Sequence, residues 1–518
     1  MKTKLRQRLA VSVVAFLVII GIVNRCNRLP SLAGRTISIA AADTAATRLG
    51  KAITPLLAAH PGLSGVYALR DARDAFAARY LLAAAAERTL DVQYYIWRHD
   101  LSGTLLMKAL VAAADRGVRV RLLLDDNNTG GLDALLAAVD SHPRIEVRLF
   151  NPFAIRKLRA LGYVTEFPRL NRRMHNKSFT ADNRATIIGG RNVGDEYFGA
   201  TDGVLFADLD VLAIGSVVAE VSSDFDRYWA SESAYPADRL LPVVDKTSIA
   251  RISSDAARVE GDAAAVMYLK AVQQTTVVRQ LREKTLPFEW AVTRMISDPP
   301  AKALDRAPRE ELLFQKFGTI FGTPSAEVDL VSPYFVPGEP GVALFGGWSK
   351  RGVRVRVLTN SFEATDVAFV HAGYAKRRKR LLAAGVALYE LRARGGSRPT
   401  ASRGMFGSSG SSLHAKTFAV DRSRIFIGSF NFDPRSAELN TEMGFVIDSP
   451  VMARRLAEVF DQDVPMNAWE VRLSKSGNVE WLERRGKSVV RHRTEPGTTV
   501  WQRMAVLLVS GLPIDSLL

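Results

Sequence analysis

The sequence predicts an α/β fold made of two similar domains in tandem. Helical and strand patterns alternate along the chain from about residue 44 onward. The string GVRVR begins at Gly117 and again at Gly352, an offset of 235 residues. A longer pattern spans Met174 to Asn192 and recurs from Leu413 to Asn431, an offset of 239 residues. Two nearly equal offsets across so long a distance indicate a duplicated domain.

The first half alternates helix and strand in a regular order. Residues 74–89 (DAFAARYLLAAAAERT) have a helix-favouring composition, and residues 90–97 (LDVQYYIW) have the aromatic and β-branched composition of a strand. Residues 104–117 (TLLMKALVAAADRG) predict a second helix that closes on a glycine, and residues 118–126 (VRVRLLLDD) predict a second strand. A helix between two strands favours a mainly parallel sheet.

The second half repeats this order. Residues 326–336 (AEVDLVSPYFV) correspond to the strand predicted at 90–97. Residues 348–361 correspond to residues 113–127, the end of a helix and the strand that follows it. The end of the chain is either a helix docked on the body or a segment that lies in a membrane interface. These patterns divide the chain into an N-terminal signal anchor and linker (1–43), a first α/β domain (44–235), a connector (236–285), a second α/β domain (286–470) and a basic C-terminal tail with that candidate interfacial segment (471–518).

The first residues predict the compartment. MKTKLRQR carries four positive charges, and the next fifteen residues, 9–23, are uncharged and almost wholly apolar. This combination is typical of a secretory signal or signal anchor. No cleavage site is evident, so we favour a retained anchor, with cleavage, or lipidation of Cys26, as alternatives. The positive-inside rule then places the chain after Val23 outside the cytoplasm.

Charge and cysteine content limit the function. The formal net charge is +17, which indicates an anionic partner: nucleic acid, a phosphate-bearing small molecule or an anionic lipid surface. Composition leaves all three open. Because Cys26 is the one cysteine, internal disulfides and multi-cysteine metal sites are excluded.

The repeated pattern carries the chemistry. In each copy a His is followed by Lys at +2, Asp at +7, Gly at +14 and Asn at +17. Each further position matches by chance about one time in twenty, so two copies are not an accident. Residues i and i+2 of a strand share a face, and the hairpin that follows brings the Asn back beside the His. The residues are His175, Lys177, Asp182, Gly189 and Asn192, and then His414, Lys416, Asp421, Gly428 and Asn431.

This set of side chains suggests two kinds of site. One is a zinc site, but an ammonium beside each His would repel a metal cation, so we expect no metal and no other cofactor. Exchange at a phosphodiester uses every member of the set. One neutral imidazole attacks phosphorus, the other imidazole protonates the leaving alkoxide, and the Lys and Asn side chains hold the phosphate oxygens. Each copy is then half of one active site.

The duplicated H-x-K-x4-D-x6-G-[GS]-x-N pattern resembles the phospholipase D superfamily. The strings DVQYYIW, GVRVRLLLDDN, GGRNVGDEYF, HAGYAKRRKRLLAAGVALYEL and LPIDSLL resemble bacterial cardiolipin synthases, in particular the type C branch. The resemblance covers nearly all of the chain after the apolar start. It implies two phospholipase D-like α/β domains related by a pseudo-twofold axis, with the active site at their interface.

The same resemblance assigns roles to residues of the site. It implies that His175 attacks and His414 donates the proton, and that Asp182 and Asp421 support the fold and the motif. It also implies that a downstream acid in each half orients the His. That acid is Glu442 in the second half and either Asp208 or Asp210 in the first. Ser429 has its counterpart in Gly190, where many relatives have Ser, so one hydroxyl near the phosphate is missing.

The activity implied is a phosphatidyltransferase that makes cardiolipin from phospholipids, including phosphatidylglycerol, through a phosphohistidine. Phosphatidylethanolamine is left open as a second substrate, and we expect contact with a membrane surface and not with nucleic acid. From the basic and apolar start of the chain we expect a location in the bacterial inner membrane, with a single N-terminal anchor and the catalytic domains on the periplasmic or extracytoplasmic side. The alternatives are a hydrolytic phospholipase D, a nuclease of the superfamily and a non-catalytic basic binding protein.

Overall fold

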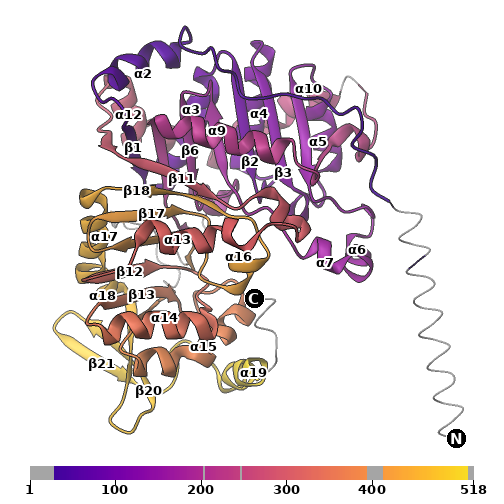
Figure 1. Cartoon of the computed structure of the whole chain (residues 1–518). Coiled ribbons are helices and arrows are strands. Elements are labelled where there is room, and N and C mark those ends of the chain that lie inside the picture. The colour runs from indigo at the N-terminus through magenta and orange to yellow at the C-terminus, as the bar shows by residue number, and fades with distance from the viewer. Residues whose placement is uncertain are drawn as a thin grey trace, which may run out of the picture.

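Each half of the chain builds one large β-sheet. The computed structural model describes residues 21, 28–201, 203, 205–245, 248–393 and 412–511 of the 518. The two sheets lie one above the other in Figure 1, with the first half in indigo and magenta and the second half in orange and yellow.

The first sheet has nine strands in the order β10-β1-β8-β6-β5-β2-β3-β4-β9. Strands β2, β3 and β4 run parallel, as the helix between the first two predicts. The other pairs are antiparallel. The strands are β1 (Ser64–Leu69), β2 (Thr89–Tyr94), β3 (Arg119–Asp125), β4 (Ile145–Phe150), β5 (Ser178–Ala181), β6 (Ala185–Gly189), β8 (Asp210–Gly215), β9 (Ala234–Pro236) and β10 (Glu289–Ala291).

The second sheet has ten strands in the order β11-β18-β17-β16-β12-β13-β14-β19-β20-β21. Its run from β18 to β14 repeats the run from β8 to β4, which is the structural form of the duplication. The strands are β11 (Thr293–Ser297), β12 (Glu327–Val331), β13 (Arg354–Asn360), β14 (Ala387–Leu391), β16 (Lys416–Val420), β17 (Arg424–Gly428), β18 (Met443–Ile447), β19 (Ala468–Leu473), β20 (Val479–Arg485) and β21 (Ser488–His492).

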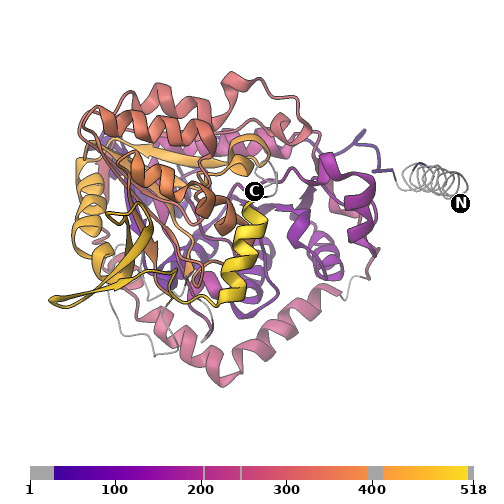
Figure 2. The ribbon, with the colours of Figure 1, turned by 90° about the horizontal axis from the view of Figure 1, so that it is seen from below.

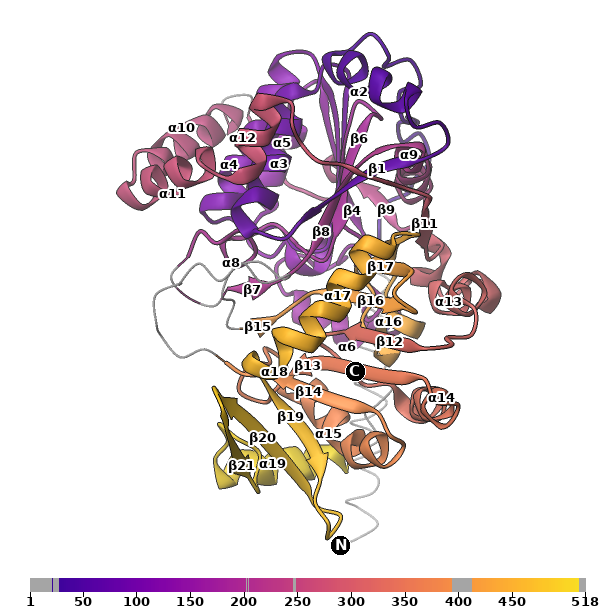
Figure 3. The same cartoon turned by 90° about the vertical axis from the view of Figure 1, so that its left-hand side faces the viewer.

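Helices cover the sheets and bury their apolar faces. In Figure 3, α3, α4 and α5 lie on one side of the first sheet and α9 on the other. In the first half the helices are α2 (Arg48–Ala58), α3 (Ala72–Ala85), α4 (Leu101–Asp115), α5 (Asp133–Asp140), α6 (Arg159–Thr165), α7 (Phe167–Leu170), α8 (Asp195–Phe198) and α9 (Ser216–Trp229). In the second half they are α13 (Leu313–Phe321), α14 (Gly338–Lys350), α15 (Ala368–Ala383), α16 (Pro434–Glu438), α17 (Pro450–Gln462), α18 (Val464–Asn467) and α19 (Val500–Ser510).

The segment between the halves is helical and packs on the first half. It forms α10 (Ser248–Glu260), α11 (Ala263–Gln273) and α12 (Thr276–Glu283), which lie against α3 and α4. Strand β10 follows and joins the first sheet beside β1, although its residues fall in the range expected to open the second domain. The second sheet likewise continues past residue 470 into β20 and β21.

The two halves share a buried core and short strand pairings. The core contains apolar residues of both sheets and of α9 and α17. Strand β7 (Phe206–Ala207) pairs in parallel with β15 (Ser412–Leu413), and Met174 forms an isolated bridge with Thr441. Both pairings join one half to the other, directly beside the predicted catalytic histidines.

The localisation predicted from the sequence, a single N-terminal anchor in the bacterial inner membrane with periplasmic catalytic domains, is corrected. Among the described residues no helix is long and apolar enough to cross a membrane. The sixteen-residue α15, for example, is about 24 Å long, carries a run of basic residues and falls short of the roughly 30 Å core of a bilayer. Apart from Gly21, the apolar run 9–23 lies outside the described residues, as do Cys26 and the closing LPIDSLL.

Candidate active site

The two copies of the motif form two equivalent hairpins that meet between the halves. His175 precedes β5 of the β5–β6 hairpin, and His414 precedes β16 of the β16–β17 hairpin. Both histidines are buried, with 7% and 6% of their surface exposed. Their backbones are held across the interface, because the amide of His175 donates to Thr441 O and that of His414 donates to Ala207 O.

The acids that orient the histidines come from the opposite halves. His175 Nδ1 lies 2.9 Å from Glu442 Oε2, and His414 Nδ1 lies 2.6 Å from Asp208 Oδ2. The sequence left Asp208 and Asp210 open and placed each acid with the His of its own half. Asp210 instead binds Arg79 at 2.8 Å. When Nδ1–H is donated to a carboxylate, the neutral ring keeps its lone pair on Nε2, which is then the atom that can react.

The two histidines and their two acids differ in the charge state that their surroundings favour. Burial, then the neighbouring Lys177, lowers the pKa of His175 well below its usual value. Burial raises the pKa of Glu442 to about 6. Burial also acts to raise the pKa of Asp208, but His414 and then Lys416 outweigh it and bring that pKa to about 2. Burial, then Lys416, also lowers the pKa of His414, but less far than that of His175. His175 is therefore the more strongly neutral ring, and His414 is the one that faces a fully ionised acid.

The motif lysines are buried beside the histidines. Each Nζ donates to the backbone carbonyl of the His two residues before it. Burial lowers the pKa of Lys177 to about 7 and that of Lys416 to about 8. Within the described part of the chain neither lysine has a carboxylate in ion-pair contact, and no group of three or more His, Cys, Asp or Glu could hold a metal ion. Two such ammonium groups suit a phosphate.

Ser429 and Gly190 occupy equivalent places but differ for a steric reason. The Ser429 hydroxyl donates to Glu442 Oε2 at 2.5 Å, so it supports the acid rather than standing free. A Cβ on Gly190 would collide with the shorter Asp208 side chain, which fills that space. A serine at position 190, equivalent to Ser429, therefore has no room in the first half.

The motif aspartates lie at the other ends of β5 and β16 from the histidines. Asp182 accepts from the amides of Arg88 and Thr89, and Asp421 accepts from those of Ala326 and Glu327. Both have a positive φ near 50° at the hairpin turn. They tie the hairpin to the start of the neighbouring strand and do not touch the histidines.

The motif asparagines differ from each other. Asn192 is engaged on both sides, accepting from Ile96 N and donating to the Tyr197 hydroxyl at 3.1 Å. Asn431 Oδ1 is buried and has no hydrogen-bond partner among the described residues.

Several side chains of the site carried no sequence signal as site residues. Tyr95 packs edge-on against His175 with ring centroids 5.0 Å apart, and Tyr197 does the same to His414 at 5.3 Å. Ser436 donates to the second oxygen of Glu442 at 2.8 Å. The tyrosines stand in the strings DVQYYIW and GDEYF, but their role depends on contacts that no spacing reveals.

Two half-sites on duplicated α/β domains, each completed by an acid of the other, define an enzyme of the phospholipase D superfamily. The family model described as cardiolipin synthase, PLD-like domain, matches residues 81–229 and 321–464. The chain belongs to this cardiolipin synthase family, which makes it a phosphatidyltransferase and confirms both the resemblance and the predicted fold class.

Known proteins resemble the chain over most of its length. Cardiolipin synthase C of Escherichia coli is 52% identical, over 91% of this chain and 100% of that protein. Cardiolipin synthase A of Pseudomonas entomophila is 26% identical, over 82% of this chain and 73% of that protein. The crystal structure of phosphatidylserine synthase from Haemophilus influenzae has a TM-score of 0.56 at 12% identity, over 91% and 100%, which is a likeness of fold.

Proposed function

We propose that this phosphatidyltransferase makes cardiolipin by moving a phosphatidyl group through a phosphohistidine onto a hydroxyl of phosphatidylglycerol. The observation that carries the proposal is the crossed pairing of His175 with Glu442 and of His414 with Asp208. Two oriented imidazoles beside two buried ammonium groups suit in-line exchange at a phosphodiester. The similarity to cardiolipin synthases supports the choice of lipid substrates.

The proposed first step uses the difference between the histidines. Neutral His175 attacks phosphorus through Nε2, and the P–O bond to the donor alcohol breaks. Protonated His414 gives its Nε2 proton to that leaving oxygen, and Asp208 stabilises the imidazolium. Lys177, Lys416 and the Asn431 amide hold the phosphate oxygens as their charge increases.

The proposed second step returns the enzyme to its starting state. His414, now neutral, takes the proton of the acceptor hydroxyl, and the new alkoxide attacks phosphorus. The P–N bond to His175 breaks, so one phosphodiester replaces another. Water as the acceptor would make the same enzyme a phospholipase D, which gives phosphatidic acid.

We also propose that a phospholipid bilayer surface is the physical partner. The C-terminal α19 has no buried residue, and its exposed apolar side chains recur at helical spacing as Val500, Trp501, Met504, Leu507 and Leu508. It packs on α15, whose exposed Lys379 and Arg380 supply positive charge for anionic headgroups.

The first half contributes a second exposed apolar surface near the site. Leu158, Leu161, Val164 and Phe167 of the α6–α7 segment are exposed, just before His175 in the chain. Figure 2 shows α19 in yellow and the α6–α7 segment in purple in the view from below. We propose that both segments rest on the bilayer. We also propose that the chain divides into a first α/β domain (44–235), a connector (236–285), a second α/β domain (286–470) and a basic C-terminal tail (471–518).

The test is a product assay with mixed vesicles. Purified protein is added to vesicles of phosphatidylglycerol with and without phosphatidylethanolamine, and labelled products are separated. Cardiolipin as the main product supports the transferase, and the lipid mixture that is consumed identifies the donor. Phosphatidic acid alone, at every phosphatidylglycerol content, would mean a hydrolase, and cleavage of plasmid DNA with no lipid product would mean a nuclease.

A further inference from the structure

The last residue of one central strand in each half contacts the backbone that leads into the catalytic hairpin. Asp125 ends β3 and Asn360 ends β13, and the two positions are related by the 235-residue offset of the duplication. Both side chains are buried, with 0% and 2% of their surface exposed. They were not among the residues that the motif indicated.

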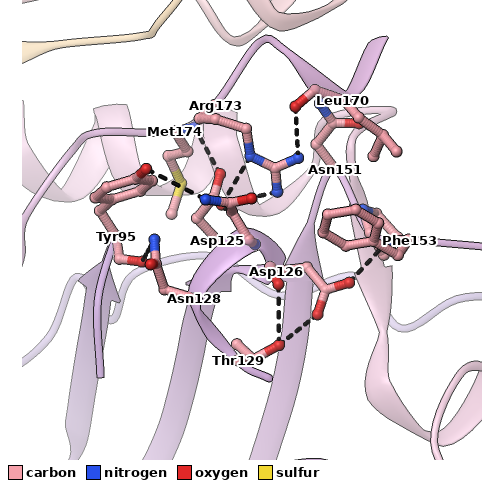
Figure 4. A network of polar contacts seen from close by, with 12 residues as sticks. Tyr95, Asp125, Asp126, Asn128, Thr129, Asn151, Phe153, Leu170, Arg173 and Met174 are labelled. Atoms are coloured by element: carbon pink, nitrogen blue, oxygen red, sulfur yellow. Dashed lines mark hydrogen bonds and ion pairs between the residues drawn. The ribbon is translucent and has the colours of Figure 1, made fainter. Parts of the chain in front are cut away.

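In the first half this contact is made by a carboxylate. Asp125 Oδ2 accepts from Met174 N at 2.7 Å, and Oδ1 accepts from Arg173 Nε at 2.9 Å and from Arg173 Nη2 at 2.8 Å. Figure 4 shows the Arg173 guanidinium turned toward Asp125 with Met174 beside it. The Asp125 side chain therefore holds Arg173 and Met174, the two residues that directly precede His175.

In the second half the same contact is made by an amide. Asn360 Oδ1 accepts from Leu413 N at 2.9 Å, and Asn360 Nδ2 donates to Leu413 O at 3.0 Å. Leu413 directly precedes His414, as Met174 directly precedes His175. The two halves thus hold the same backbone position with different chemistry.

The backbone segments that lead to the two histidines also pair, across the interface, with the residue that directly precedes each acid. The amide of Thr441 donates to Arg173 O, and the amide of His175 donates to Thr441 O, both at 2.9 Å. Thr441 directly precedes Glu442. On the other side Leu413 pairs with Ala207, which directly precedes Asp208. A shift of either segment would therefore move a histidine relative to its acid.

We propose that Asp125 and Asn360 are a matched pair of positioning residues, each fixing the histidine of its own half against the acid supplied by the other half. This strand-end clamp acts through the backbone and touches neither substrate nor reacting atoms. Its role goes beyond the proposed function, because it concerns the geometry of both histidine–acid pairs whichever acceptor is used. A misplacement of about 1 Å at such a site costs on the order of a hundredfold in rate.

Exchanging Asp and Asn at these two positions should disturb different contacts in the two halves. Asp125→Asn keeps an acceptor for Met174 N but loses the ion pair and leaves Arg173 buried without its carboxylate. Asn360→Asp keeps an acceptor for Leu413 N but places a carboxylate against Leu413 O, where the amide had donated. Asp91→Asn is the matched control, because Asp91 is also buried and its side chain binds a guanidinium, that of Arg121 at 2.6 Å. The Asp91 backbone pairs with Thr180 of β5, but its carboxylate makes no hydrogen bond to either hairpin among the described residues.

The decisive measurement is the ¹⁵N NMR spectrum of the histidine side chains in the full chain. The signals of His175 and His414 are assigned from the peaks missing in the His175→Ala and His414→Ala variants. Asp125→Asn should move the His175 Nδ1 signal and spare that of His414, and Asn360→Asp should do the reverse. Movement of both signals by either variant, of neither signal, or of His175 by Asp91→Asn to the same extent would overturn the proposal.

A kinetic arm separates positioning from general destabilisation. We expect kcat of Asp125→Asn and Asn360→Asp to fall about 30- to 100-fold with KM within about twofold. Asp91→Asn should lower the melting temperature comparably and keep kcat within about threefold. If the wild-type protein transferred no phosphatidyl group, the proposed function would fail, while the NMR result would still decide on the clamp.

Discussion

His175 Nδ1 lies 2.9 Å from Glu442 Oε2, although 267 residues separate the two along the chain. His414 and Asp208 form the corresponding pair at 2.6 Å. Neither half can therefore orient its own histidine, and the active site exists only when the two sheets are packed together. This arrangement explains why the chain carries the motif twice.

The crossed acids predict which step each substitution slows. Glu442→Gln should impair phosphohistidine formation at His175, and Asp208→Asn should impair proton transfer through His414. Each should lower kcat by about 10² to 10⁴, since an amide can hold the imidazole in the wrong tautomer. Single-turnover kinetics measures the two steps separately. Slowing of the same step by both variants would contradict the division of roles.

The assignment of His175 as the nucleophile predicts where the intermediate accumulates. A labelled phosphatidyl ester of p-nitrophenol needs no acid to release its leaving group. His414→Ala should therefore form the phosphoenzyme and fail to resolve it, whereas His175→Ala should form none. Acid-labile label on the protein is the measurement, with His60→Ala, at a half-buried histidine that stacks on Trp290, as the unaffected control. The opposite pattern would exchange the two roles.

The lowered lysine pKa values predict the alkaline limit of activity. Lys177 and Lys416 must be charged to hold phosphate, and their pKa values of about 7 and about 8 mean that the charge is lost as the pH rises through that range. The value of kcat/KM should fall accordingly. Lys177→Arg should move the decline to higher pH because a guanidinium stays charged. Lys108→Arg, remote from the site, should leave it in place, and an unmoved decline in Lys177→Arg would refute this cause.

The lack of space at Gly190 predicts an asymmetric response to serine. Gly190→Ser should displace Asp208 from His414, lowering kcat at least tenfold and stability by about 1–3 kcal/mol. Gly130→Ser provides the control, since nothing lies within 4 Å of a Cβ there. Ser429→Gly should cost less, because Glu442 keeps its bond from Ser436. Normal kcat in Gly190→Ser would mean that Asp208 is not needed in this position.

The exposed face of α19 predicts how the enzyme reaches its substrate. Replacing Trp501, Leu507 and Leu508 by Ser removes apolar area worth about 1.5 kcal/mol or more per side chain when buried. Binding to phosphatidylglycerol vesicles should weaken at least tenfold by cosedimentation. Turnover of a soluble short-chain phosphatidylglycerol should stay unchanged. Val243→Ser, which alters an even more exposed apolar residue elsewhere, should bind vesicles normally, and equal loss in that variant would count against α19.

The sequence by itself determined the α/β class, the duplication, the family and the set of motif residues. Strand, turn and returning strand are local patterns, so His175 and Lys177 could be placed on one hairpin from spacing alone. The repeated offset required no structure either, because it compares the chain with itself. The localisation drawn from the same local information was wrong, since no helix among the described residues is long and apolar enough to cross a membrane.

Only the tertiary structure decided between Asp208 and Asp210, moved each acid to the opposite histidine and showed that Asp182 and Asp421 lie away from the reaction. The physical reason is that these choices depend on how two sheets pack, and side chains more than 200 residues apart meet only there. Asp210 begins β8 and binds Arg79, whereas Asp208 lies two residues before that strand and reaches across the interface to His414. The strand-end contacts of Asp125 and Asn360 arise in the same way, because β3 and β13 lie one strand away from β5 and β16 in their sheets but far from them in the chain.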